Sequence, residues 1–343
     1  MSEWLSDFGM FLAQLASLVV IVGLAVAVAV RLRGEVGEKS RLRLETLNDS
    51  RDYRRRRLTL AASEPGERKG LLKAFRREDK SRDKAKGKAT RPTVWVLEFH
   101  GDIRASGTER LAEEVSALID AAREGDEAVV RLESAGGLVH SYGLAAAELD
   151  RLREAGLTTT VCIDKVAASG GYLMACGADR LRAAPLAVLG SIGVVAQLPN
   201  FHRLLKRHDI DVELLTAGRY KRTLTVFGEN TDEGREKFLD DLEGIHELFK
   251  RHVAERRPGL DIEAVATGET WYGREALEKG LVDELGTGEA YLMERMKEAR
   301  VIRVRLEPKR RLGDRLGLAV SRGAERAIER GLEVLDNSRW QRR

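Results

Sequence analysis

From Thr93 onward, apolar and polar positions follow two alternating periods. Short apolar runs bounded by polar or turn residues predict strands, here over 93–99, 127–133, 158–164 and 211–217. Apolar residues that recur every three or four positions predict amphipathic helices, here over 107–123, 141–156 and 234–257. Strands that alternate with helices usually pair in parallel, so the pattern predicts an α/β domain over residues 93–300.

A run of uncharged residues lies near the N-terminus, from Met10 to Val30. A helix of this length reaches roughly 30 Å, enough to cross a bilayer core. The segment Ala25–Ala27 fits a signal-peptidase site, but no Lys or Arg precedes the run and it is long for a signal peptide. We therefore expect residues 1–31 to form an uncleaved, single-pass transmembrane helix. Basic residues follow the run, so the positive-inside rule favours a cytoplasmic body.

The rest of the chain consists of an acidic body between two basic segments. Residues 31–92 hold 21 Lys and Arg against 10 Asp and Glu, residues 93–301 hold 26 against 37, and residues 302–343 hold 12 against 6. We expect residues 32–92 to be a basic juxtamembrane region beside the lipid bilayer, with a linker from residue 64 to 92. Nucleic acid is not an expected partner, because no stacking aromatics are interleaved with the charges. The basic tail, residues 301–343, has an amphipathic pattern over 314–336 that is typical of a packing or assembly helix.

Residues 166–195 are nearly free of charge in a chain that is one third charged. They do not form a second membrane span, because Pro185 and several glycines and polar residues interrupt the apolar run. Buried core is the better interpretation. The two cysteines, Cys162 and Cys176, lie in apolar surroundings and are expected to be buried thiols without a disulfide.

Two glycine-rich turns, "LESAGGLVHSYG" and "DKVAASGGYLMA", each follow a predicted strand. Backbone N–H groups at such strand-to-helix junctions have no partner within the helix, so two converging turns could hold an oxyanion beside a serine. The alternative is that both are tight turns required only for packing. A phosphate-binding loop is the weaker interpretation, because neither turn has the required glycine and lysine spacing.

A nucleophilic serine needs a base. None of the six histidines lies in a context that pairs it with Ser169, and His246 and His252 are six residues apart rather than the four of a zinc-protease helix. Lys221, after the predicted strand 211–217, is the other candidate. A lysine pKa of about 10.4 must fall to about 7–8 for this role, which requires burial. From these residues alone, a surface lysine is the favoured interpretation and a catalytic base the alternative.

The motifs together resemble the signal peptide peptidase A family of Ser/Lys proteases, peptidase family S49, and most closely its short, N-terminally anchored SohB-type branch. The resemblance covers about residues 93–290. It rests on "HGDI", "RLESAGGLV", "VAASGGYLMACGADRLRA", "GSIGVV", "GRYKR" and "WYGREALEKGLVDELG", in that order. It implies a ClpP/crotonase-like spiral of parallel-sheet repeats with flanking helices, and a serine endopeptidase without a cofactor or metal.

The resemblance also implies roles for individual residues. Ser169 would be the nucleophile and Lys221 the general base, while Ser191 would bond the lysine amine. The amides of Gly136 and Gly170 would form the oxyanion hole. Substrates would be apolar peptides, such as signal-peptide remnants or membrane-protein fragments, at a bacterial inner membrane.

Two departures from the family pattern matter. The first turn reads Ser134-Ala135-Gly136-Gly137, where relatives carry Ser-Pro-Gly-Gly, so a fixed φ is lost. The chain has a single repeat, and in this family neighbouring repeats or protomers complete the dyad, so we expect a homo-oligomeric ring. The alternatives are a catalytically silent membrane scaffold of the same fold and a crotonase-like acyl-CoA enzyme, whose oxyanion hole would look the same.

Overall fold

The computed structural model describes residues 40–85 and 91–307. Within these residues the compact body extends from Arg43 to Arg305. The apolar run 10–30 and the amphipathic pattern 314–336 lie outside the described residues. Among the residues that are described, no helix is long and apolar enough to span a membrane.

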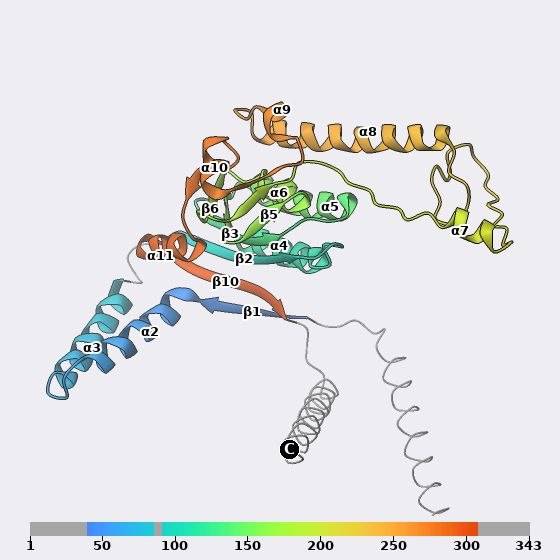
Figure 1. Cartoon of the computed structure of the whole chain (residues 1–343). Coiled ribbons are helices and arrows are strands. Elements are labelled where there is room, and N and C mark those ends of the chain that lie inside the picture. The colour runs from blue at the N-terminus through green and yellow to red at the C-terminus, as the bar shows by residue number, and fades with distance from the viewer. Residues whose placement is uncertain (1–39, 86–90, 308–343) are drawn as a thin grey trace, which may run out of the picture. The chain divides into compact units, whose positions relative to one another are not determined.

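The body is a mixed α/β sheet with flanking helices (Figure 1). The strands are β1 (Arg41–Thr46), β2 (Thr93–Gly101), β3 (Glu127–Ser134), β4 (Thr158–Ile163), β5 (Val166–Ala168), β6 (Arg180–Ala183), β7 (Val188–Gly190), β8 (Thr270–Tyr272), β9 (Glu284–Leu285) and β10 (Arg300–Glu307). The helices are α2 (Leu47–Ala62), α3 (Arg68–Ala85), α4 (Thr108–Ala121), α5 (Val139–Glu154), α6 (Gly170–Ala175), α7 (His202–Arg207), α8 (Asp232–Arg256), α9 (Ile262–Val265), α10 (Gly273–Glu278) and α11 (Gly288–Glu298).

The main path of the sheet runs β1-β10-β2-β3-β4-β6-β9, and β5, β7 and β8 continue from β3 as a side branch. The pairs from β10 through β9, and those of β5 with β3 and β7, are parallel, whereas β7 and β8 are antiparallel. The predicted parallel sheet is therefore confirmed. Strand β10 begins at the expected domain boundary, residue 300, and pairs with β2 from Arg300 to Arg303.

Alternate residues of the central strands supply two cores. Leu97 and Phe99 of β2 pack with helices α4, α5 and α6 on one face, while Val94 and Val96 pack with α11 on the other. A sheet covered on both faces explains why its strands read as nearly continuous apolar runs. Both cysteines are buried and free, as expected, and burial raises each thiol pKa to about 12.

Two sequence expectations are wrong. The segment 64–92 was expected to be a linker, but it contains helix α3. Ion pairs join this helix to α2: Arg55 and Arg56 of α2 bind Glu78 and Asp79 of α3, and Arg56 also lies 5.2 Å from the ring centre of Phe75. The other error concerns 211–217, which is exposed and forms no strand.

Candidate active site

The two glycine-rich turns lie next to each other at one edge of the sheet. Parallel pairing places Gly101 beside Ser134, Ser134 beside Ala167, and Ala168 beside Gly190. The carboxyl ends of β2, β3, β5 and β7 therefore meet in one row. Loops that follow such strand ends are where α/β proteins commonly place their chemistry.

Ser169 adopts a strained backbone conformation immediately after β5. Its φ of 50° and ψ of −123° are rare for a residue with a side chain, and such strain costs on the order of 1–3 kcal/mol. The surrounding structure holds it there: its N–H donates to the Gly190 carbonyl at 2.8 Å, and its own carbonyl accepts from the Leu173 N–H at 3.0 Å. Ser169 is half-buried and its side chain does not cap α6. A sharp strand-to-helix turn of this kind presents a hydroxyl at the sheet edge.

Gly136 lies against Ser169. A Cβ added to Gly136 would come within 2.7 Å of both the Gly170 nitrogen and the Ser169 Cβ, and its φ of 92° favours glycine. The first turn of α6 leaves its leading N–H groups without acceptors inside the helix. The Gly136 N–H donates to Ser134 Oγ at 3.1 Å in the described chain. The two turns therefore converge, as the sequence predicts.

Ser191 follows Gly190 at the end of β7, next to the end of β5. Neighbouring strands are about 4.8 Å apart, so Ser191 and Ser169 occupy adjacent strand ends. The φ of Ser191 is also positive, at 52°, and its N–H donates to the Glu269 carbonyl at 2.6 Å. The structure thus brings together four of the five predicted site residues: Ser169, Ser191, Gly136 and Gly170.

Lys221 lies elsewhere. It is exposed in the arm, which we define as residues 194–231 between β7 and α8 (Figure 1). Its neighbours contact the start of α8: Arg219 pairs with Glu233 at 2.7 Å, and Lys237 lies 6.0 Å from the ring centre of Tyr220.

The nucleophile end of the site contacts the other end of α8, where His252 Nε2 lies 3.0 Å from the Leu173 carbonyl. Lys237 and His252 are 15 residues apart in this helix, or about 22 Å. Within one chain, Lys221 and Ser169 are therefore separated by a distance on the order of 20 Å.

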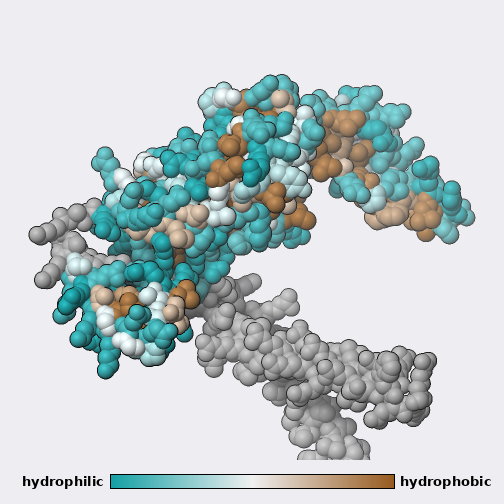
Figure 2. Space-filling view, turned by 60° about the vertical axis from the view of Figure 1, so that its left-hand side comes forward, coloured by the Kyte–Doolittle hydropathy of each residue, from teal (hydrophilic) through white to brown (hydrophobic). Residues whose placement is uncertain are grey.

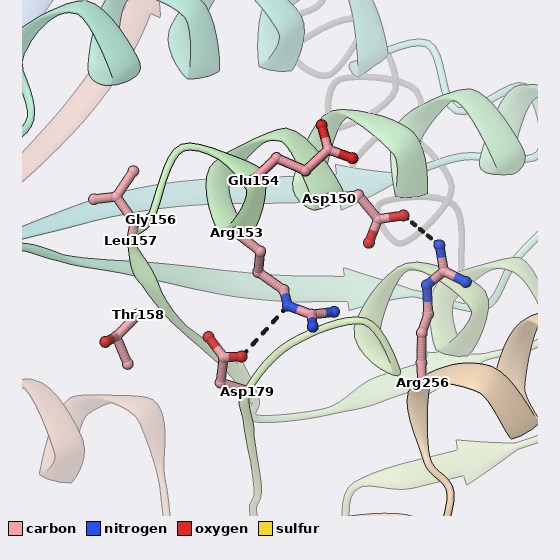
Figure 3. A pocket seen from close by; sticks show the side chains of 8 residues that line it. All are labelled: Asp150, Arg153, Glu154, Gly156, Leu157, Thr158, Asp179 and Arg256. Carbon is pink, nitrogen blue, oxygen red and sulfur yellow. Dashed lines mark hydrogen bonds and ion pairs between the residues drawn. The ribbon is translucent and has the colours of Figure 1, made fainter.

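A pocket of about 750 Å³ opens near the start of β4, where Thr158 is part of its lining (Figure 3). This is the opposite edge of the sheet from Ser169. Four of its five charged side chains form ion pairs: Arg153 binds Asp179 at 3.3 Å, and Arg256 of α8 binds Asp150 of α5. The serine edge therefore remains the candidate site.

Sequence reasoning gave no role to Ser134 and Tyr142, which are buried beneath the glycine turns. Tyr142 falls within the predicted helix 141–156, and the helical pattern gives it no role in the site. Its hydroxyl contacts Ser134 at the end of β3 and the Asp102 carbonyl after β2, which the fold brings together. No local signal reveals these contacts.

Comparison with known proteins assigns the family. The model of peptidase family S49 matches residues 151–302, and the model of its N-terminal region matches residues 3–149. The chain is 42% identical to "Probable protease SohB" of Haemophilus influenzae over 96% of this chain and 97% of that protein.

The protein of the same description from Buchnera aphidicola subsp. Acyrthosiphon pisum is 49% identical over 68% of this chain and 70% of that one. A solved structure of a mutant "1510-N membrane-bound stomatin-specific protease" in complex with a substrate peptide has a TM-score of 0.41 and 12% identity, and it covers 68% of this chain and 99% of that one; this likeness is too distant to support an argument. The two family models and the near-complete match to the Haemophilus protein show that the chain belongs to peptidase family S49.

Proposed function

We propose that this peptidase is a membrane-anchored serine endopeptidase whose active site is completed between copies of the chain. Ser169 of one copy is the nucleophile, and Lys221 of a neighbouring copy is the general base. The observation that carries the proposal is the strained Ser169, held against Gly136 and Gly170 at the sheet edge. Strain of this kind persists where function requires it.

The proposed chemistry follows from these positions. The Ser169 hydroxyl attacks a peptide carbonyl as the neutral lysine amine takes its proton. The N–H groups of Gly170 and Gly136 stabilise the oxyanion, and the lysine then returns the proton to the leaving amine. Ser191, on the adjacent strand end, holds the amine toward Ser169. Water then hydrolyses the acyl-enzyme by the same proton path.

The surface of the arm supports assembly. Large apolar side chains are exposed along it, among them Leu198, Phe201, Leu204, Ile210, Leu214, Leu215 and Phe227. Figure 2 shows apolar patches along this part of the chain. Exposed apolar surface of this extent is typical of a protein interface. A second copy is the proposed partner, because contact with the arm is also what would carry Lys221 to another Ser169.

Helix α8 and the segment 211–217 also support assembly through the arm. Only Phe249 and Val253 of α8 are buried, both near its C-terminal end, whereas Leu239 is 58% exposed. The sequence of 211–217 is that of a strand, yet a strand forms only when a partner strand is available. Both features fit a chain whose arm packs against a neighbour. Burial there would also favour the neutral form of a lysine.

The proposal has three further parts, which concern the membrane anchor, the substrates and the fold subclass. The apolar run 10–30 is the proposed single-pass anchor in a bacterial inner membrane, with the body on the cytoplasmic side. The proposed substrates are apolar peptides released from membrane proteins. The proposed fold subclass is a ClpP/crotonase-like spiral. Membership of a peptidase family argues against the acyl-CoA alternative.

Active-site labelling tests the proposal against the scaffold alternative. Full-length protein in detergent is treated with a fluorophosphonate probe, in wild type and in Ser169→Ala, and cleavage of an apolar peptide is followed in parallel. We expect wild type to label and to cleave, and Ser169→Ala to do neither. Intact wild-type assemblies that neither label nor cleave would favour the scaffold.

A further inference from the structure

Tyr142 contacts Gly170 directly and Gly136 through Ser134, and the amides of these two glycines bind the oxyanion in the proposed function. The side chain belongs to α5 and is 0% exposed. A Cβ added to Gly170 would come 2.4 Å from the Tyr142 Cγ, so the ring lies directly against the first residue of α6. The Tyr142 hydroxyl lies 2.6 Å from Ser134 Oγ, which accepts the Gly136 N–H. One side chain therefore supports both turns.

The direction of each hydrogen bond around Tyr142 can be deduced. Its hydroxyl donates to the Asp102 carbonyl at 2.7 Å, because a carbonyl can only accept. That bond uses its one hydrogen, so Ser134 must donate to Tyr142. Ser134 Oγ keeps its acceptor lone pairs, and one of them accepts the Gly136 N–H at 3.1 Å. Burial raises the pKa of Tyr142, so the phenol keeps its proton.

We call this chain of hydrogen bonds from Gly136 through Ser134 and Tyr142 to Asp102 the relay. Asp102 is itself held in place. The Asp102 carboxylate accepts hydrogen bonds from the Ser106 N–H at 2.9 Å, the Ser106 hydroxyl at 2.7 Å and the Arg104 N–H at 3.1 Å. At Gly101, a Cβ would come 2.4 Å from the Tyr142 hydroxyl oxygen and 2.5 Å from Ser134 Oγ, so only glycine leaves room for the relay. The loop after β2 thus anchors the turn after β3.

We propose that Tyr142 is a positioning residue for the oxyanion hole, and this rests on the proposed function above. Its ring supports Gly170, and its hydroxyl holds the Gly136 peptide through Ser134. The turn needs such support because Ala135 supplies no fixed φ before two glycines. The bond from Gly136 to Ser134, at 3.1 Å, is an ordinary neutral hydrogen bond, and it holds the turn until a negatively charged oxyanion, the stronger acceptor, takes up the N–H.

The test compares full-length wild type with Tyr142→Phe, Ser134→Ala and the double variant. Tyr142→Phe keeps the ring against Gly170 and removes only the hydroxyl. The matched control is Tyr291→Phe, whose buried hydroxyl bonds Glu127 at 2.5 Å and Thr160 at 3.2 Å on the opposite face of the sheet. Peptide cleavage is normalised to the amount of Ser169 that a fluorophosphonate labels at completion. Inhibition by a peptidyl aldehyde, which forms a tetrahedral adduct, is measured as well.

We expect Tyr142→Phe to lower kcat by about 10-fold and leave KM within about twofold, because the lost contact positions a donor that is used in the transition state. Aldehyde affinity should fall by the same factor. Ser134→Ala should lose a similar amount, and the double variant no more than either single one, because both break the same relay. Tyr291→Phe should retain wild-type kcat.

Three results would overturn the role of Tyr142: an unchanged kcat in Tyr142→Phe, an equal loss in Tyr291→Phe, or losses that add in the double variant. None of these results contradicts the proposed protease function, because the wild-type protein would still be labelled and would still cleave peptides. A wild type that does neither would remove the proposed function and the role of Tyr142 with it.

Discussion

Lys221 lies near the start of helix α8, whereas Ser169 lies near its last turns. The start of the helix contacts the arm through Glu233, and its last turns contact α6 through His252. The sequence resemblance requires these two side chains to meet, yet the chain holds them on the order of 20 Å apart. A second copy reconciles the two observations. The exposed apolar surface of the arm gives the physical reason for such a copy to bind.

The backbone strain at Ser169 makes a prediction about stability. Glycine adopts a φ of 50° and a ψ of −123° without the steric cost that a Cβ imposes. Ser169→Gly should therefore be more stable than Ser169→Ala by about 1 kcal/mol, as measured by urea denaturation, and both should be inactive. Equal stability of the two variants would show that the serine is not strained.

Gly136 should not tolerate a side chain. Gly136→Ala places a Cβ within 2.7 Å of the Gly170 nitrogen and the Ser169 Cβ, so the two turns must separate. We expect cleavage to fall by at least about 100-fold, the cost of losing an oxyanion donor.

The control for this variant is Gly143→Ala in α5, where no atom lies within 4 Å of the added Cβ. It should retain activity and be more stable by about 0.5–1 kcal/mol, because alanine favours the helix. If Gly136→Ala cleaves as well as Gly143→Ala, the turn is not part of the site.

The packing of α8 on α6 should depend on pH through His252. Burial lowers the pKa of this histidine, and Arg256 lowers it further. Its Nε2 donates to the Leu173 carbonyl at 3.0 Å, which raises the pKa, but burial is the larger effect and the folded state favours the neutral ring. Below the ordinary histidine pKa of about 6.5 the unfolded chain binds the proton more readily, so stability falls as the pH decreases.

Urea denaturation at pH 7.5 and pH 5.5 tests this dependence. Wild type should lose more stability than His252→Gln, whose amide can still donate to the carbonyl but does not titrate. Other acidic and basic groups are common to both proteins and cancel in the comparison. An equal loss in the two proteins would assign the pH dependence to other groups.

The arm should control assembly and activity together. Leu215 is 88% exposed there, and a charge at this position would oppose burial against a neighbour. Leu215→Glu should dissociate the detergent-solubilised assembly in light scattering and abolish cleavage, with the fold retained by circular dichroism. Leu58→Glu, at a position of α2 that is 72% exposed, should do neither. Full activity of dissociated Leu215→Glu would contradict assembly through the arm.

Local pattern predicts much of the fold. Apolar runs predicted β2, β3 and β4, which are buried on both faces, and helical periods predicted α4, α5 and α8, which bury one face over all or part of their length. Helix α3 escaped prediction because its segment is dominated by charged residues, and its contacts to α2, such as the pair of Asp79 with Arg56, are not visible in the local pattern. The strand expected over 211–217 does not form, because pairing depends on a partner that sequence pattern does not supply.

The site was predictable to the extent that it depends on strand ends. Parallel strands bring their carboxyl ends together, which places Ser169, Ser191 and the two glycines in one row. The relay through Ser134 and Tyr142 was not predictable, because it joins residues from two strand ends and a helix by hydroxyl contacts. The position of Lys221 depends on the direction of the arm, which no local pattern specifies.

Complementation between two inactive variants tests the central claim most directly. Ser169→Ala and Lys221→Ala are co-expressed in equal amounts, and the purified mixed assemblies are assayed for peptide cleavage. If the dyad forms between copies, an intact serine meets an intact lysine at about a quarter of the sites, so about a quarter of wild-type activity should return. Mixed assemblies of wild-type size that remain as inactive as either variant alone would contradict a site shared between copies.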